Sequence, residues 1–139
     1  MTQELDISKV EACAAWLEES AEGYKSSQSI HWLIDQIGNL SKAMAFVNNQ
    51  MAIAKLIYNN RKVKAYHALL TSSIANEKYF SATQGKDYIS GKLATEQYCF
   101  DLCERTSRTI THTMEALRTC ISALKEEAKL EGYVNQQNA

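Results

Sequence analysis

The 139-residue sequence contains no proline and only five glycines. At average usage, a chain of this length would hold about seven prolines and ten glycines. Because the many turns of sandwiches and barrels use these residues, their scarcity argues against an all-β protein and for a few long helices. It also weighs against glycine-rich phosphate loops, and neither GxGxxG nor GxxxxGK occurs in the sequence.

Long apolar runs are also missing. No stretch approaches the length needed to cross a bilayer, and the first residues lack the basic and apolar regions of a signal peptide. The four cysteines, at positions 13, 99, 103 and 120, form neither a CxxC pair nor the spacing of a secreted disulfide framework. We therefore expect a cytoplasmic protein with reduced thiols and no contact with membranes.

Catalytic motifs are equally scarce. None of the three histidines has a partner at HExxH or ExxH spacing, and no GxSxG elbow occurs. His112 and Glu115 are three residues apart and could touch a metal, but such pairs are common on helix surfaces. The cysteines lie in apolar helical contexts, where they act as small buried hydrophobes. We expect no catalytic residues, no metal and no cofactor, and hence not an enzyme.

Helix signals divide the chain into three main segments. Asp6 is a good N-cap for a first helix over 7–22, which Gly23 would end. Ser29 can cap a long helix over 30–78, in which apolar residues recur in steps of three and four, with Gly38 as a candidate kink. A break at 80–85 precedes a third helix over 86–131, which has a candidate bend at Gly91 and is closed by Gly132.

The third helix carries a heptad pattern with polar interruptions. Its apolar members form two series of seven-residue steps: Leu93, Phe100, Met114 and Ile121, and Ile110, Leu117 and Leu124. A 46-residue helix spans about 69 Å, whereas a compact chain of this size has a radius of gyration of about 14 Å. We therefore predict an all-α fold, an elongated helical hairpin or coiled-coil-like bundle of three main helices in a single domain over 1–139.

The long second helix carries further apolar residues on other faces, among them Leu56, Val63 and Leu70. A helix that is apolar on several faces is usually packed on more than one side. This pattern favours a homo-oligomer, with the seams of the second and third helices as contact surfaces. The alternative is a bent helical bundle that stays monomeric.

Charge is unevenly distributed along the chain. The formal net charge is −1, but residues 1–37 carry −5, residues 38–125 carry +6 and residues 126–139 carry −2. Residues 36–76 contain no acid at all, where average composition would place about five. An acid-free run of this length is a candidate surface for an anionic partner.

Within this run, cations, amides and aromatic rings alternate over residues 55–67. Phosphates are bound by mobile cations and amide donors, and unpaired bases stack on flat rings. Helical spacing places Lys55, Asn59, Lys62 and Tyr66 on one side of the helix. The third helix adds Arg105, Arg108 and Arg118. The alternative interpretation is a solvated basic face that pairs with the acidic first helix.

Two segments also resemble a known family. MAIAKLIYNNRKVKAY over 51–66 and TMEALRTCISALK over 113–125 are similar to the UvsY-like recombination mediators of phages, short helical proteins that bind single-stranded DNA. The resemblance covers about residues 45–130; the acidic first helix lies outside it.

The resemblance implies a ring-like homo-oligomer in the cytoplasm of a host cell that helps to load a recombinase onto strands coated by a single-strand-binding protein. Carried over by position, phosphate contacts would fall to Lys55, Arg61, Lys62 and Lys64. Tyr58 and Tyr66 would stack or support, and the third-helix seam would hold subunits together. The competing hypothesis is a helical structural or adaptor protein that uses the same heptads for partners and its charges for solubility.

Overall fold

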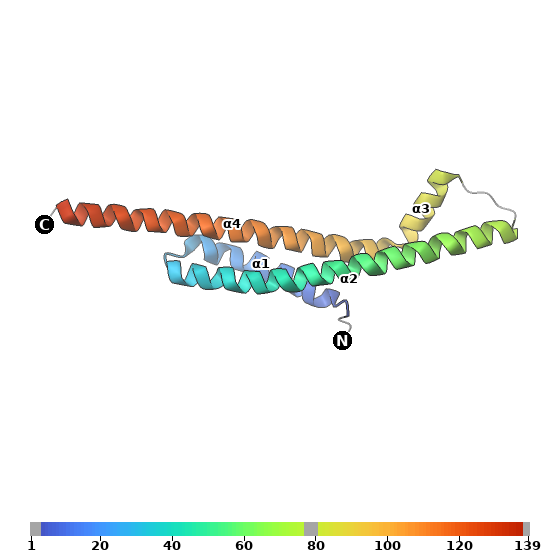
Figure 1. The fold of residues 1–139 in the computed structure, drawn as a ribbon, viewed down its shortest axis with the longest axis horizontal. Coiled ribbons are helices and arrows are strands. Elements are labelled where there is room, and N and C mark those ends of the chain that lie inside the picture. The colour runs from blue at the N-terminus through green and yellow to red at the C-terminus, as the bar shows by residue number, and fades with distance from the viewer. Residues whose placement is uncertain (1–3, 77–80, 138–139) are drawn as a thin grey trace.

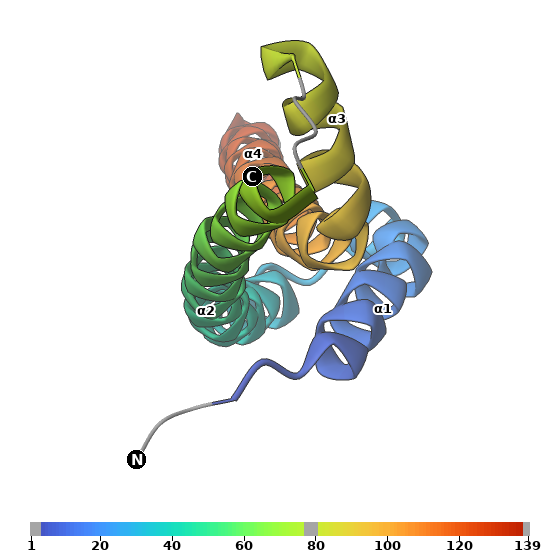
Figure 2. The ribbon, with the colours of Figure 1, turned by 90° about the vertical axis from the view of Figure 1, so that its right-hand side faces the viewer.

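The computed structural model describes residues 4–76 and 81–137, and these residues form four α-helices. They are α1 (Ile7–Ser26), α2 (Ile30–Asn76), α3 (Ala82–Lys92) and α4 (Ala94–Gln137). The long helices α2 and α4 run antiparallel, and α1 packs along part of both (Figure 1). Seen from one end, α1, α2 and α4 surround a common axis (Figure 2). The all-α prediction is confirmed.

The predicted helix starts have the local chemistry expected of them. The side chain of Asp6 accepts a hydrogen bond from the Lys9 amide at 3.2 Å, and Ser29 Oγ accepts one from the Trp32 amide at 3.2 Å. These side chains satisfy amides that have no partner in the first turn of a helix. The caps therefore fix where α1 and α2 begin.

Most of the core consists of three columns of side chains, one each on α1, α2 and α4. Within each column the members are seven residues apart: Val10, Leu17 and Tyr24 on α1; Leu33, Leu40 and Val47 on α2; Cys103, Ile110 and Leu117 on α4. Seven residues make almost two helical turns, so each column stays on one face of its helix. The heptads predicted in the sequence thus pack against each other within one chain.

Two predicted helix ends are wrong. Helix α1 continues through Gly23 to Ser26, and α4 continues through Gly132 to Gln137. Glycine inside a helix costs only about 1 kcal/mol relative to alanine. Burial of Tyr24 in the core provides a reason for α1 to continue one turn further. Helix α2 likewise runs through Gly38 and ends at Asn76; positions 77 and 78 of its predicted range lie outside the described residues.

The third predicted helix is two helices. Helix α3 starts with a capping box between Ser81 and Gln84 and ends at Lys92, and α4 starts at Ala94 with Leu93 between them. Gly85, predicted to belong to a break, lies inside α3, and Phe80 lies outside the described residues. Leu93 is buried at this corner, and Figure 1 shows α3 leaving the axis of α4 there.

The predicted use of the third-helix seam as the subunit contact also needs correction. Ile110, Leu117 and Ile121 belong to the core of this one chain, and Met114 and Leu124 pack against that core. Phe100 is half-buried. Helices α1 and α2 of the same protomer therefore cover most of the seam, and a contact between copies needs other apolar residues.

Candidate nucleic-acid interface

The second half of α2 extends beyond α1 and forms one end of the rod (Figure 1). The main-chain amide of Asp6 donates to Gln50 Oε1 at 2.6 Å, which fixes the start of α1 beside the middle of α2. Residues 55–76, which we term the basic arm, follow this point and contain four cations and no acid. Among the described residues, only α3 and the first turns of α4 accompany the arm.

The arm carries the predicted DNA-binding lysines, with Lys55 and Lys62 on one face of α2 and Lys64 on another. Asn48, Lys55 and Lys62 are seven residues apart on α2, so they follow one face of the helix. The lysines at 55, 62 and 64 are exposed, and Tyr66 is half-buried. None of these three lysines forms an ion pair with an acid in residues 4–76 or 81–137. They are available to an anion from solution.

Aromatic rings accompany these cations. The Lys62 ammonium lies 5.7 Å from the centre of the Tyr58 ring, within the range of a cation–π contact. Helix α3 supplies a similar pair, in which the Lys92 ammonium lies 5.0 Å from the Tyr88 ring centre. Lys92 and Tyr88 also line a hollow with Ala65 and Leu69 of the arm. The fold therefore places Lys92 of α3 beside the arm. The sequence interpretation missed this cation.

Arg61, which is predicted to contact phosphate, has an acidic partner within the fold. Its guanidinium pairs with the carboxylate of Glu96 at the start of α4. The Glu96 side chain is only 11% exposed, and the hydrogen bond from Arg61 lowers the pKa of this carboxyl group. Arg61 thus neutralises a largely buried acid at the α2–α4 contact, which leaves its charge less available for phosphate than those of the lysines.

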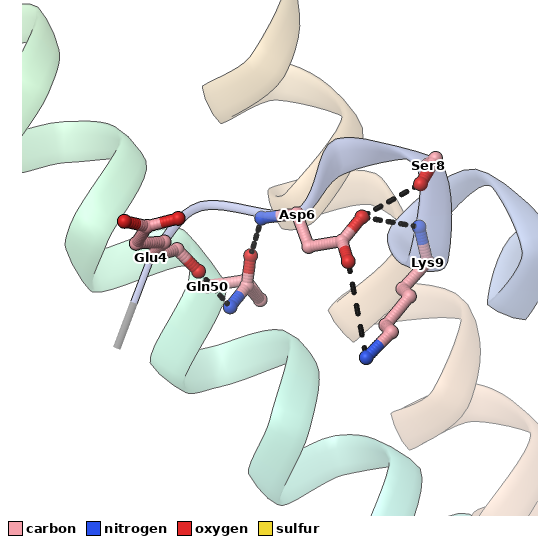
Figure 3. A network of polar contacts seen from close by, with 5 residues as sticks. All are labelled: Glu4, Asp6, Ser8, Lys9 and Gln50. Atoms are coloured by element: carbon pink, nitrogen blue, oxygen red, sulfur yellow. Dashed lines mark hydrogen bonds and ion pairs between the residues drawn. The ribbon is translucent and has the colours of Figure 1, made fainter. Parts of the chain in front are cut away.

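Two amides of the acid-free run are also occupied within the fold. Asn48 Oδ1 accepts a hydrogen bond from Ser107 Oγ on α4 at 2.7 Å. Gln50, 3% exposed, accepts from the Asp6 amide and donates to the Glu4 carbonyl at 3.2 Å (Figure 3). These amides position α1 and α4 on α2.

Two of the three arginines predicted on the third helix, Arg105 and Arg108, lie on α4 apart from the arm. Arg108 pairs with Glu104 one turn earlier at 2.9 Å. Arg105 is exposed beside α1, where it lines a hollow with Ala14 and Leu17. Both belong to the three-helix section, so the structure does not bring them together with Lys62 and Tyr66.

The acidic first helix does not neutralise the arm. Its Glu11 Oε1 accepts a hydrogen bond from Tyr98 on α4 at 3.4 Å. Among the described residues, no ion pair joins an acid of α1 to a base of α2 or α4. This arrangement weighs against the interpretation that the basic face exists to pair with α1.

Other parts of the described structure offer less polar chemistry. A hollow of about 330 Å³ between α1 and α4 is lined mainly by apolar groups, including Ala21, Leu117 and Cys120. The four cysteines are unpaired, and burial raises the thiol pKa at positions 13, 99 and 103. Within residues 4–76 and 81–137, no three His, Cys, Asp or Glu side chains gather in a metal-binding cluster.

Comparisons with known proteins returned no relatives. No family model, no curated protein and no solved structure matches this chain. A search of the described helices for a membrane span found none that is both long and apolar enough.

Proposed function

We propose that this protein binds single-stranded DNA without sequence preference, as a homo-oligomer and without catalysis. The observation that carries the proposal is the basic arm, in which exposed Lys55, Lys62 and Lys64 have no described acidic partner and Lys62 lies beside the Tyr58 ring. Binding of single strands without sequence preference uses two elements: cations that contact the phosphate backbone, and aromatic rings on which the bases stack.

The resemblance to UvsY-like mediators refines this proposal. It suggests a role in phage recombination or repair in the cytoplasm of the host, with a recombinase or a single-strand-binding protein as partner. The segment that carries the resemblance contains the exposed lysines of the arm, which are Lys55, Lys62 and Lys64.

Salt dependence distinguishes phosphate contacts from stacking. Each phosphate contact on a single strand contributes about 0.7 to the log–log slope of affinity against salt. Lys62→Ala should therefore weaken binding to all oligonucleotides and reduce the slope by about that amount. Lys42→Ala, an exposed lysine on the same helix outside the arm, is the matched control and should leave the slope unchanged.

The ring of Tyr66 is tested separately. Tyr66→Ala should weaken binding by about 1–3 kcal/mol if a base stacks there, with little change in slope. Tyr66→Phe keeps the ring and should retain most of the affinity. Equal salt slopes for Lys62→Ala and Lys42→Ala would argue against a phosphate contact at Lys62. Equal affinities for Tyr66→Ala and Tyr66→Phe would argue against stacking on Tyr66.

A second candidate function is that of a structural or adaptor protein. The observation in its favour is the exposed apolar stripe on the same arm, formed by Leu56, Val63 and Leu70. If the parent binds no oligonucleotide at low salt, this second function becomes the better account of the arm.

A further inference from the structure

Two exposed apolar surfaces lie at opposite ends of the rod. On the basic arm, Leu56, Val63 and Leu70 are 61%, 69% and 61% exposed. They are seven residues apart and so form a stripe along one face of α2. Large apolar residues gathered on one exposed face, rather than scattered singly, mark interaction sites.

The second surface lies on residues 126–137 of α4, which we term the tail. Leu130, Tyr133 and Val134 are 64%, 67% and 55% exposed, and steps of three and four place them on one face. The tail projects beyond α1 and the start of α2, so none of the other described helices accompanies it (Figure 1).

The two surfaces match in charge and length. The arm contains cations and no acids, and the tail contains Glu126, Glu127 and Glu131 against one lysine. Fourteen residues separate Leu56 from Leu70, or about 21 Å of helix, and the 12-residue tail is about 18 Å long. An apolar strip between lysines can therefore face an apolar strip that has Glu127 and Glu131 along one side. Glu126 lies at the N-terminal end of the tail strip and pairs with Lys129 at 3.5 Å.

We propose that the tail of one protomer docks on the basic arm of a second copy, with Leu130 and Val134 against Leu56 and Val63. The arm and the tail lie at opposite ends of the same rod (Figure 1), so the tail of a protomer cannot dock on the arm of that same protomer. The contact is head to tail, and its repetition builds a closed ring or an open chain.

The proposal rests on the homo-oligomeric part of the proposed function and not on DNA binding.

Light scattering in the absence of nucleic acid tests the contact with two variants. The arm variant is Leu56→Glu with Val63→Glu, and the tail variant is Leu130→Glu with Val134→Glu. Each should be monomeric at concentrations where the parent is oligomeric, because each places charges in an apolar contact. Ile34→Glu, at an exposed position of α2 outside the arm, is the control and should assemble like the parent.

Mixing the two variants gives the most specific result. The arm variant keeps an intact tail and the tail variant keeps an intact arm, so an equimolar mixture should form a dimer and nothing larger. A mixture that stays monomeric would overturn the head-to-tail contact, as would variants that assemble like the parent. A monomeric parent would overturn both the contact and the homo-oligomer, while DNA binding would be measured independently.

A charge-only variant covers the case in which the glutamates disturb folding. Lys62→Glu with Lys64→Glu leaves the apolar stripe intact and changes two exposed side chains. It should weaken assembly of the full chain, and weaken it most at low salt. Unchanged assembly, with helix content equal to that of the parent by circular dichroism, would contradict the proposal.

Discussion

Gln50 is the side chain whose loss should reveal most about how α1 is fixed. It is buried in the middle of α2, where its amide accepts a hydrogen bond from the Asp6 amide and donates one to the Glu4 carbonyl (Figure 3). Gln50→Leu removes both hydrogen bonds while keeping nearly the same side-chain volume. The change therefore isolates the polar contacts from the effect of a cavity.

The expected cost follows from the burial of the two groups left behind. The Glu4 residue is exposed, so water can replace its partner, but Asp6 is half-buried and its amide loses a partner across the bundle. An unsatisfied buried donor costs about 1–3 kcal/mol. We expect the free energy of unfolding to fall by that amount, which at about 2 kcal/mol per M of urea lowers the midpoint by about 0.5–1.5 M.

The assay is urea unfolding followed by circular dichroism at one fixed protein concentration, since association would otherwise shift the midpoint. Asn39→Leu, which removes an exposed amide from the same helix, is the control and should stay within about 0.5 kcal/mol of the parent. If Gln50→Leu also stays within that range, the link between the N-terminal segment and α2 does not contribute to stability as argued.

Three further predictions concern the fold. Gly23→Ala should stabilise the protein by up to about 1 kcal/mol, because α1 runs through this position and an added methyl group meets no atom within 4 Å; a loss of thermal stability would contradict this. Leu117→Glu should destabilise by about 3 kcal/mol or more because it buries a charge in the core, whereas Ala116→Glu at the exposed neighbouring position should be tolerated in the same unfolding assay. Arg61→Ala should lower stability at pH 7 by removing the partner of Glu96. Arg61 lowers the folded pKa of Glu96 from its ordinary value of 4.5. The stability that this pair contributes is therefore present above about pH 5 and is lost as the pH falls through the folded pKa. The difference between Arg61→Ala and the parent should therefore shrink at about pH 3, and a difference that is independent of pH would refute this assignment.

The predictable parts of the fold are those that local chemistry and periodicity determine. Asp6 and Ser29 cap α1 and α2 as predicted, and Ile110 and Leu117 face the core as their spacing indicates. Each of these features depends on residues within one or two turns of one helix. Such signals are strong in a chain that consists of a few long helices.

The remaining features depend on contacts between distant segments. Glu96 is 35 residues from Arg61, and no spacing rule links them before the helices are paired. The same holds for Gln50, whose hydrogen-bond partner Asp6 is 44 residues away along the chain. The break between α3 and α4 at Leu93 contains no proline, and the nearest glycine, Gly91, lies within α3. Leu93 itself is buried at this corner. Which residues of a basic run remain free is thus decided by tertiary structure.

The central claim is that the arm binds single-stranded DNA through phosphate contacts. The most direct test is titration of the parent with a labelled single-stranded 30-mer across a series of salt concentrations, with the duplex of the same sequence alongside. The account predicts binding to single strands of different sequence at low salt, with log affinity falling linearly with log salt by about 0.7 for each phosphate contact. Absence of binding at low salt, or binding that does not change with salt, would contradict it.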